Sequence, residues 1–155
     1  MILKKVEIKD KNLLENMMQL YLHDLSLYFP IEFDSTTCKY DYNLDSYFEK
    51  NVAFFIENEK QEKLGFILID LLSNTNYEIS EMFILNNYKR KGIGDEAVKD
   101  IFNKYRGDWI VKAVPLSIVA EKFWDNVINN YTNGKYSIDH IGKYKRAVLK
   151  FNNKN

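Results

Sequence analysis

Hydrophobic and polar residues alternate from Ile2 to Lys9, and this period of two predicts a first β-strand. Between Leu13 and Tyr28 the apolar positions follow helical spacing instead, which predicts an amphipathic helix that ends before Pro30. Residues 31–42 are polar and acidic with no clear period, so we expect a loop there. The next apolar positions indicate a short second helix, and they are Leu44, Tyr47 and Phe48.

The middle of the chain is typical of an antiparallel meander. Three apolar runs separated by polar turns predict its strands, at 52–56, 64–72 and 77–85. Beyond them we expect a helix over 95–105 that Gly107 ends, because glycine commonly follows the last helical turn. The remaining pattern predicts a strand at 109–114, a helix at 119–129 and strands at 135–141 and 145–151. The chain is therefore expected to form one α/β (α+β) domain, with a central sheet of about seven strands flanked by about four helices.

The composition limits what this domain does. Among 155 residues, 22 are Lys or Arg and 22 are Asp or Glu, so nothing favours binding to nucleic acid or to an anionic membrane surface. The apolar runs are too short to cross a bilayer, and the first residues lack the apolar core of a signal peptide, so we expect a cytoplasmic protein. Cys38 is the only cysteine, and His23 and His140 have no ligand spacing around them, so neither a disulfide nor a metal site is expected.

One basic stretch with two glycines, Lys89-Arg90-Lys91-Gly92-Ile93-Gly94, lies between a predicted strand and a predicted helix. Glycine allows the backbone to approach a ligand closely, and the first N–H groups of a helix have no partner within it. With the three positive side chains, these features favour a phosphate-bearing ligand. The stretch is not a P-loop, since Asp95 follows Gly94, and it is not a dinucleotide fingerprint, since Ala97 takes the place of the third glycine. A tight, solvated turn remains the alternative.

The stretch resembles the coenzyme A loop of the GNAT family of N-acetyltransferases, Arg/Gln-x-x-Gly-x-Gly/Ala, although its first residue is Lys89. The order of the predicted elements resembles this family along essentially the whole chain. The resemblance implies a mixed, mostly antiparallel sheet in which the strands before and after the loop's helix run parallel and splay apart at one end. It also implies acetyl-CoA as co-substrate, with residues 77–129 as the coenzyme A-binding core and residues 1–50 as the acceptor side. Homodimers are frequent in the family.

The resemblance assigns residues to the coenzyme. The pantetheine arm is expected along the main chain of Phe83, Ile84 and Leu85. An N–H near Phe83 or Ile84 would polarise the thioester carbonyl if this strand carries the family's bulge. The pyrophosphate is expected on the backbone from Lys89 to Gly94.

A second family motif, Asn-x-x-Ala-x-x-Phe-Tyr, is altered in this chain, since Ser117 replaces the Asn and Trp124 replaces the Tyr. The resemblance implies that Ser117 binds the pantetheine through its hydroxyl and that Phe123 lies at the coenzyme. Trp124 would pack against the coenzyme arm or the core. Because an indole cannot protonate a thiolate, this proton would come from Tyr131, from Tyr136 or from solvent.

For the catalytic base, Glu81 is the first candidate. It lies in an otherwise apolar strand just before the loop, where many family members carry a Glu. Burial would raise its pKa and favour proton acceptance, directly or through a water molecule. Glu78 is the rival, but it points to the opposite face if the strand is regular. The alternative for Glu81 is that it orients the amine or makes a structural hydrogen bond.

The segment from Asp24 to Glu49 is acidic and rich in aromatic residues. An acidic, aromatic wall suits a cationic amine such as a polyamine, an aminoglycoside or a lysine side chain, and the first candidates to bind it are Asp24, Tyr28 and Tyr42. For any single residue, a solvated acidic loop is the alternative.

The expected function is acetyl transfer from acetyl-CoA to a primary amine, on a small cationic molecule, by direct attack in a ternary complex. A protein-lysine or N-terminal acetyltransferase is an alternative within the enzyme class. A non-catalytic acyl-CoA-binding or regulatory module on the same fold is another, and the loss of the motif Asn and Tyr motivates it. A plain interaction domain that binds no coenzyme A is the third.

Overall fold

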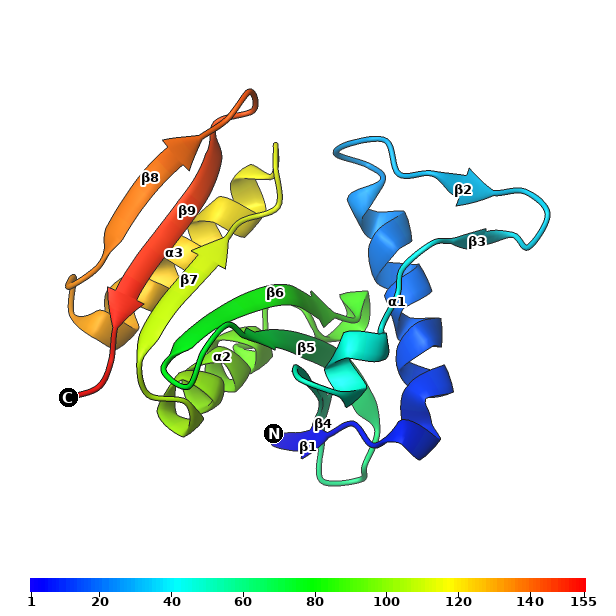
Figure 1. The fold of residues 1–155 in the computed structure, drawn as a ribbon, viewed down its shortest axis with the longest axis horizontal. Coiled ribbons are helices and arrows are strands. Elements are labelled where there is room, and N and C mark those ends of the chain that lie inside the picture. The colour runs from blue at the N-terminus through cyan, green and yellow to red at the C-terminus, as the bar shows by residue number, and fades with distance from the viewer.

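A computed structural model describes all residues from Met1 to Asn155. It contains one seven-stranded sheet with the strand order β1-β4-β5-β6-β7-β9-β8 and three α-helices (Figure 1). The strands are β1 Ile2–Lys5, β4 Val52–Glu57, β5 Lys63–Leu71, β6 Asn76–Ile84, β7 Asp108–Lys112, β8 Ser137–Ile141 and β9 Arg146–Asn152. The helices are α1 Lys11–Leu25, α2 Ile93–Lys104 and α3 Ile118–Thr132. None of the helices has the length and apolar character needed to cross a membrane.

The strands β6 and β7 form the one parallel pair of an otherwise antiparallel sheet. Their register runs from Asn76 opposite Asp108 to Ile79 opposite Val111, and β6 then continues unpaired on this side to Ile84. Figure 1 shows the two strands separating beyond the paired part. The predicted mixed sheet with two splayed parallel strands is therefore confirmed.

Two hydrophobic cores lie on opposite faces of the sheet. The larger one packs α2 and α3 against the sheet and includes Ile67 and Ile69. The smaller one packs α1 against β4, β5 and β6 and includes Phe66 and Leu68. Because β5 is covered on both faces, its sequence is an almost continuous apolar run rather than an alternating one. The α1 core includes no buried residue of β7 or β9, so helical cover on this face stops near the splay.

The helix count differs from the prediction of about four. The predicted second helix is a single 3₁₀ turn at Asp45–Phe48, too short to form a regular α-helix. The predicted loop at 31–42 contains a small hairpin, β2 Phe33–Asp34 and β3 Lys39–Tyr40. Strands of two residues have no period that a sequence could reveal. Two further 3₁₀ turns, Ile8–Asp10 and Asn86–Tyr88, precede α1 and α2.

Gly107 does not end α2 as predicted. The helix stops at Lys104, and Tyr105 already has an extended backbone. A Cβ atom on Gly107 would lie 2.0 Å from the carbonyl oxygen of Thr75, so glycine is required for close passage of two chain segments. The Gly107 N–H donates to Oδ1 of Asn153 at 2.8 Å, which ties this turn to the end of the chain.

Candidate active site

Strand β6 carries a bulge immediately before Glu81. Leu68 of β5 pairs with Glu81 and Ile69 pairs with Ile79, which leaves Ser80 as the extra residue. Ile79 packs in the core with α2 and α3, and Met82 packs against it, so the two residues between them both face the α1 side. Glu78 also faces this side, because it neighbours Ile79 on the regular part of the strand. The expectation that Glu78 and Glu81 lie on opposite faces is therefore wrong, since the strand is not regular.

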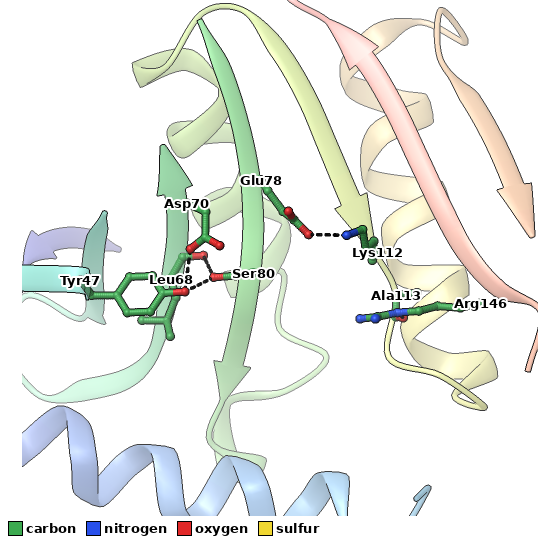
Figure 2. Close-up of polar contacts among 8 residues, drawn as sticks. All are labelled: Tyr47, Leu68, Asp70, Glu78, Ser80, Lys112, Ala113 and Arg146. Atoms are coloured by element: carbon green, nitrogen blue, oxygen red, sulfur yellow. Dashed lines mark hydrogen bonds and ion pairs between the residues drawn. The ribbon is translucent and has the colours of Figure 1, made fainter. Parts of the chain in front are cut away.

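A hydrogen-bond network holds the bulge (Figure 2). The Tyr47 hydroxyl donates to Oδ1 of Asp70 at 2.6 Å and lies 2.6 Å from Oγ of Ser80. Ser80 Oγ in turn donates to the carbonyl oxygen of Leu68 at 3.2 Å. Burial, helped by the hydrogen bond to Asp70, raises the pKa of the Tyr47 phenol far above its usual value, so the phenol stays protonated. The network fixes the backbone at Ser80 and therefore the position of Glu81, the next residue.

The Glu81 carboxyl group is largely withdrawn from water. Its Oε2 atom is buried and has no hydrogen-bond partner. Burial raises the pKa of Glu81 from 4.5 to about 7, with smaller contributions from Asp70 and Glu78, while Tyr21 and Arg146 act in the opposite direction. A carboxyl group with this pKa and a free oxygen can accept a proton near neutral pH.

Two phenols border Glu81 from the acceptor half of the chain. Burial, followed by the charge of Glu81, raises the pKa of both Tyr21, on α1, and Tyr42, which follows the β2–β3 hairpin. Both phenols therefore remain neutral hydrogen-bonding groups next to the carboxylate. Tyr42 was among the predicted acceptor residues, whereas Tyr21 was not.

The space between the diverging ends of β6 and β7, beyond Ile79 and Val111, is called the gap from here on. Its wall on the β7 side is basic. Lys112, at the end of β7, places Nζ 3.3 Å from Oε1 of Glu78 across the splay. Arg146, at the start of β9, donates from Nε to the carbonyl oxygen of Ala113 at 2.7 Å. Figure 2 shows both cations facing β6 from the β7 side. Acids on one wall and bases on the other thus flank the space in front of Glu81.

The glycine loop connects β6 to α2. Arg90 and Gly92 have left-handed backbones with φ of 61° and 78°, and Gly92 is the N-cap of α2 without any side-chain cap. The N–H groups of Arg90, Lys91 and Gly92 make no hydrogen bond within the protein. The first-turn N–H groups of α2 have no intrahelical partner either. Free amides, exposed Lys and Arg side chains and the positive end of a helix suit a phosphate.

The residues of the second family motif lie at the start of α3 and on its face toward α2. Some contact the start of α2 beside the glycine loop, and others are buried in the core. A Cβ atom on Gly94 would lie 3.3 Å from the Phe123 ring, so Phe123 covers the first turn of α2. Trp124 packs edge-to-face on Phe123 and is 7% exposed within the α2–α3 core. Ser117 is the buried N-cap of α3 and accepts the Ala120 N–H at 3.1 Å, which leaves its hydroxyl hydrogen free to donate.

The end of β6 offers main-chain groups to the gap at alternate residues. The Leu85 N–H donates to Leu64 on β5 at 2.8 Å, so it points away from the gap. Main-chain groups of successive strand residues point to opposite edges, and those of Ile84 therefore face the side that β7 has left. The side chain of Phe83 packs in the α1 core and that of Ile84 in the opposite core.

The three predicted acceptor residues do not come together. Tyr42 lies near Glu81 and also lines a hollow of about 710 Å³ between α1 and the β2–β3 hairpin. Asp24 places Oδ2 3.7 Å from Nζ of Lys89, so it faces the glycine loop. Tyr28 follows the end of α1 and is exposed. Acidic side chains in the lining of the hollow are Glu15, Glu32, Asp34 and Asp41.

Two tyrosines considered as proton donors lie elsewhere. The Tyr131 hydroxyl donates to Oδ1 of Asn103 at 3.0 Å, at the end of α2 opposite to the glycine loop. The Tyr136 hydroxyl donates to the carboxylate of Asp125. Each hydroxyl is therefore engaged with a partner on α2 or α3. No group of three or more His, Cys, Asp or Glu side chains is arranged to hold a metal ion.

The site also contains residues that the sequence analysis did not single out. Tyr21 lies on the apolar face of a predicted helix, where it looks like any core residue. Asp70 is the one acid in an apolar run and could have been noticed on that ground. Ser80 and Arg146 give no local signal, because a bulge and the pairing of β9 with β7 bring them to the site.

The sequence model of the acetyltransferase (GNAT) family matches residues 14–124, which is well over half of the chain and includes Glu81, the glycine loop and Trp124. The chain belongs to the GNAT acetyltransferase family. It is accordingly an N-acetyltransferase by family. No curated protein matches the sequence.

Solved GNAT structures have the same fold. An acetyltransferase from Thermus thermophilus has a TM-score of 0.68 at 15% identity, over 97% of this chain and 96% of that chain. A GNAT acetyltransferase from Staphylococcus aureus has a TM-score of 0.63 at 13% identity, over 99% of each chain. Spermidine N-acetyltransferase from Vibrio cholerae, solved with CoA and spermine, has a TM-score of 0.58 at 11% identity, over 96% of this chain and 92% of that chain. At these identities the likeness concerns the fold alone.

Proposed function

We propose that this GNAT protein transfers an acetyl group from acetyl-CoA to the primary amine of a small cationic molecule, by direct attack while both substrates are bound. One observation carries the proposal: Glu81 is a largely buried carboxyl group with a free oxygen and a pKa of about 7, in the splay that follows the parallel pair. The Vibrio cholerae structure of the same fold, which holds CoA and spermine, supports this donor and this acceptor class.

Residues 77–129 would hold the donor. The free amides from Arg90 to Gly92 and the start of α2 bind the pyrophosphate, assisted by the charges of Lys89, Arg90 and Lys91. The main chain from Phe83 to Leu85 receives the pantetheine arm, with Ile84 presenting its N–H and carbonyl to the gap. Acetyl-CoA, when bound, supplies the acetyl group as a reactive thioester.

The α3 residues complete the donor site. Ser117 donates its free hydroxyl hydrogen to the pantetheine, and Phe123 covers the first turn of α2 beside the phosphates. Trp124 supports Phe123 from the core side. Because the hydroxyls of Tyr131 and Tyr136 are engaged with other partners, the leaving thiolate takes its proton from solvent.

Residues 1–50 would form the acceptor side, together with the acids of β5 and β6. An ammonium group approaching Glu81 is stabilised by the negative charges of Asp70 and Glu78 and donates a hydrogen bond to the Tyr42 hydroxyl. Glu81 then removes one proton, so that the neutral amine attacks the thioester carbonyl. The C–S bond breaks as the new C–N bond is retained, and the second nitrogen proton passes to solvent. Asp24 and Tyr28 lie nearer to the end of α1 and attract the more distant cationic part of the acceptor.

The experiment is a comparison of Glu81→Gln with the wild type in an acetylation screen read by CoA release. We expect kcat to fall about 100-fold or more, as for loss of a general base, with the KM for acetyl-CoA nearly unchanged. In the wild type, kcat/KM falls as the pH drops through about 7, because protonated Glu81 cannot accept a proton; this step disappears in the variant.

Glu57→Gln is the matched control. Glu57 is also buried, at 2% exposure, but it pairs with Lys63 at the far end of β4. Its replacement is expected to leave the pH profile unchanged. Retention of both turnover and the pH step in Glu81→Gln would remove Glu81 as the base.

A second function is favoured by the replaced motif residues. Trp124 stands buried where the family carries a tyrosine, which fits a module that binds acyl-CoA without turning it over. Tight binding of acetyl-CoA in calorimetry, with no CoA release for any amine in a panel of polyamines, aminoglycosides, amino acids and peptides, would establish this function instead.

A further inference from the structure

Arg146 is a positioned cation with most of its hydrogen-bonding capacity unused. Its Nε donates to the carbonyl oxygen of Ala113 at 2.7 Å, which fixes the plane of the guanidinium at the end of β7. Neither terminal nitrogen makes a hydrogen bond to the protein, and no carboxylate pairs with the side chain. By contrast, the terminal nitrogens of Arg106 are shared among Tyr131, Asn103 and the Asn153 carbonyl.

The free face of Arg146 is directed into the catalytic gap. Figure 2 shows the guanidinium reaching over the end of β7 toward β6, where Ser80 and Glu78 lie. Its charge acts on Glu81 and on the Tyr21 phenol, so the cation and the proposed base border the same space. The neighbouring cation, Lys112, is already paired with Glu78 and leaves Arg146 as the unpaired one.

A planar guanidinium with two free terminal nitrogens matches a carboxylate, to which it donates two parallel hydrogen bonds. The hydrogen bond to Ala113 uses only Nε, so a purely structural role would not explain why the two terminal nitrogens are held in place and left free. Partial burial strengthens this recognition, because less water competes for the same donors.

We propose that Arg146 binds a carboxylate of the acceptor, so that the substrate is an amino acid whose amine faces Glu81 while its carboxylate lies on the terminal nitrogens of Arg146. The inference rests on the proposed function and specifies its acceptor. Basic amino acids such as lysine and ornithine combine the cationic character expected from the acidic wall with the carboxylate that Arg146 requires. Arg146 is then a specificity residue that neither takes nor gives the transferred proton.

The test uses acceptor pairs that differ only in the carboxylate, namely lysine with cadaverine and ornithine with putrescine. We expect the wild type to prefer each amino acid by about 10-fold or more in kcat/KM, as hydrogen bonds to a charged group allow. Arg146→Gln should lose this preference, with little change in the KM of acetyl-CoA. Because the variant also lacks a charge that lowers the pKa of Glu81, turnover with both acceptors changes together, and the amino acid-to-diamine ratio of kcat/KM is the quantity compared. Arg146→Lys should recover part of the preference for amino acids, because an ammonium still attracts the carboxylate but cannot donate the two parallel hydrogen bonds of a guanidinium.

Lys150→Gln is the matched control, since Lys150 is an exposed base on the same face of β9 and lies opposite Ile110, where β7 is still paired with β6. It should keep the preference. Melting temperatures of all variants show whether each is folded. Equal use of amino acids and diamines by the wild type, an equal loss for both in Arg146→Gln, or the same loss in Lys150→Gln would overturn the proposal.

Absence of CoA release with every acceptor would contradict the proposed function instead. Calorimetry of lysine binding to the CoA-saturated protein then tests whether Arg146 binds a carboxylate. Binding of lysine to the wild type but not to Arg146→Gln would support the carboxylate site, and absence of lysine binding to the wild type would overturn it.

Discussion

Glu81 occupies a position that favours proton transfer at the expense of the folded state. Its pKa rises from 4.5 to about 7 on folding, chiefly because burial disfavours the charged form. The folded protein therefore holds the proton more tightly than the unfolded chain does. The contribution of Glu81 to stability is fully present below pH 4.5 and is lost as the pH rises through about 7.

Glu81→Gln should consequently be more stable than the wild type at alkaline pH. Because Gln has no charge to bury, we expect a gain of up to about 3 kcal/mol at about pH 8, which shrinks toward zero near about pH 4.5. Urea unfolding at both pH values measures the difference. A gain of the same size at both pH values would show that the charge of Glu81 is not its cause.

At the scale of elements, the bulge in β6 determines where the base lies. Tyr47→Phe removes the hydroxyl that joins Asp70 to Ser80 while preserving the ring in the core. We expect a loss of about 1 to 2 kcal/mol of unfolding free energy and a several-fold fall in kcat, because the backbone before Glu81 is less well fixed. Urea unfolding and steady-state kinetics measure the two effects.

Tyr77→Phe separates the two effects of that change. Tyr77 is buried like Tyr47, but it lies on β6. Its hydroxyl donates to the Asn74 carbonyl in the turn at 3.0 Å, away from Glu81. It should reduce stability with no change in kcat. An equal fall of kcat in both variants would indicate a general effect of the strand rather than an effect of the bulge.

Elements with a long apolar run or a clear apolar period were predictable from sequence, and elements with neither were not. The runs that became β4 and β5 matched within about a residue at each end, as sequence patterns allow. The β2–β3 hairpin was missed because neither strand exceeds two residues. A bulge in β6 was expected only from the family resemblance, and its position at Ser80 could not be predicted, because it depends on how β6 pairs with β5, which no local pattern of β6 records.

The site followed the same rule. Glu81 and the loop from Lys89 to Gly94 could be picked out because each breaks a local pattern, an acid in an apolar strand and glycines beside positive charges. Tyr21 and Arg146 could not, since their roles come from the meeting of α1 and β9 at one gap. Residues supplied by distant segments carry no mark of their partners in the sequence.

At the scale of the whole molecule, the proposed coenzyme site draws on β6, α2 and α3 and so should stabilise the entire fold when filled. At about 100 times its Kd, acetyl-CoA is expected to add about 2.7 kcal/mol, or about 5 to 10 °C in Tm for a chain of this size. Thermal unfolding with and without acetyl-CoA measures the shift.

Gly92→Ala tests whether the glycine loop is responsible. Gly92 and Gly134 both have left-handed backbones, with φ of 78° and 81°, so an alanine at either should cost about 1 kcal/mol or more. Only at Gly92 does the added Cβ point into the open space beside the loop amides. A reduced ligand shift in Gly92→Ala and a normal one in Gly134→Ala are expected, whereas equal shifts would place the phosphates elsewhere.

The strand order has a consequence for how the enzyme is made. β9 follows β8 along the chain, yet it lies between β7 and β8 in the sheet. On the ribosome β8 therefore emerges before β9, the one strand that it pairs with, and it joins the sheet only through β9. A nascent chain that has just completed β8 already contains Glu81 and every proposed coenzyme residue. It still lacks Arg146, so the cation proposed to bind the acceptor's carboxylate is made only after the whole proposed coenzyme site.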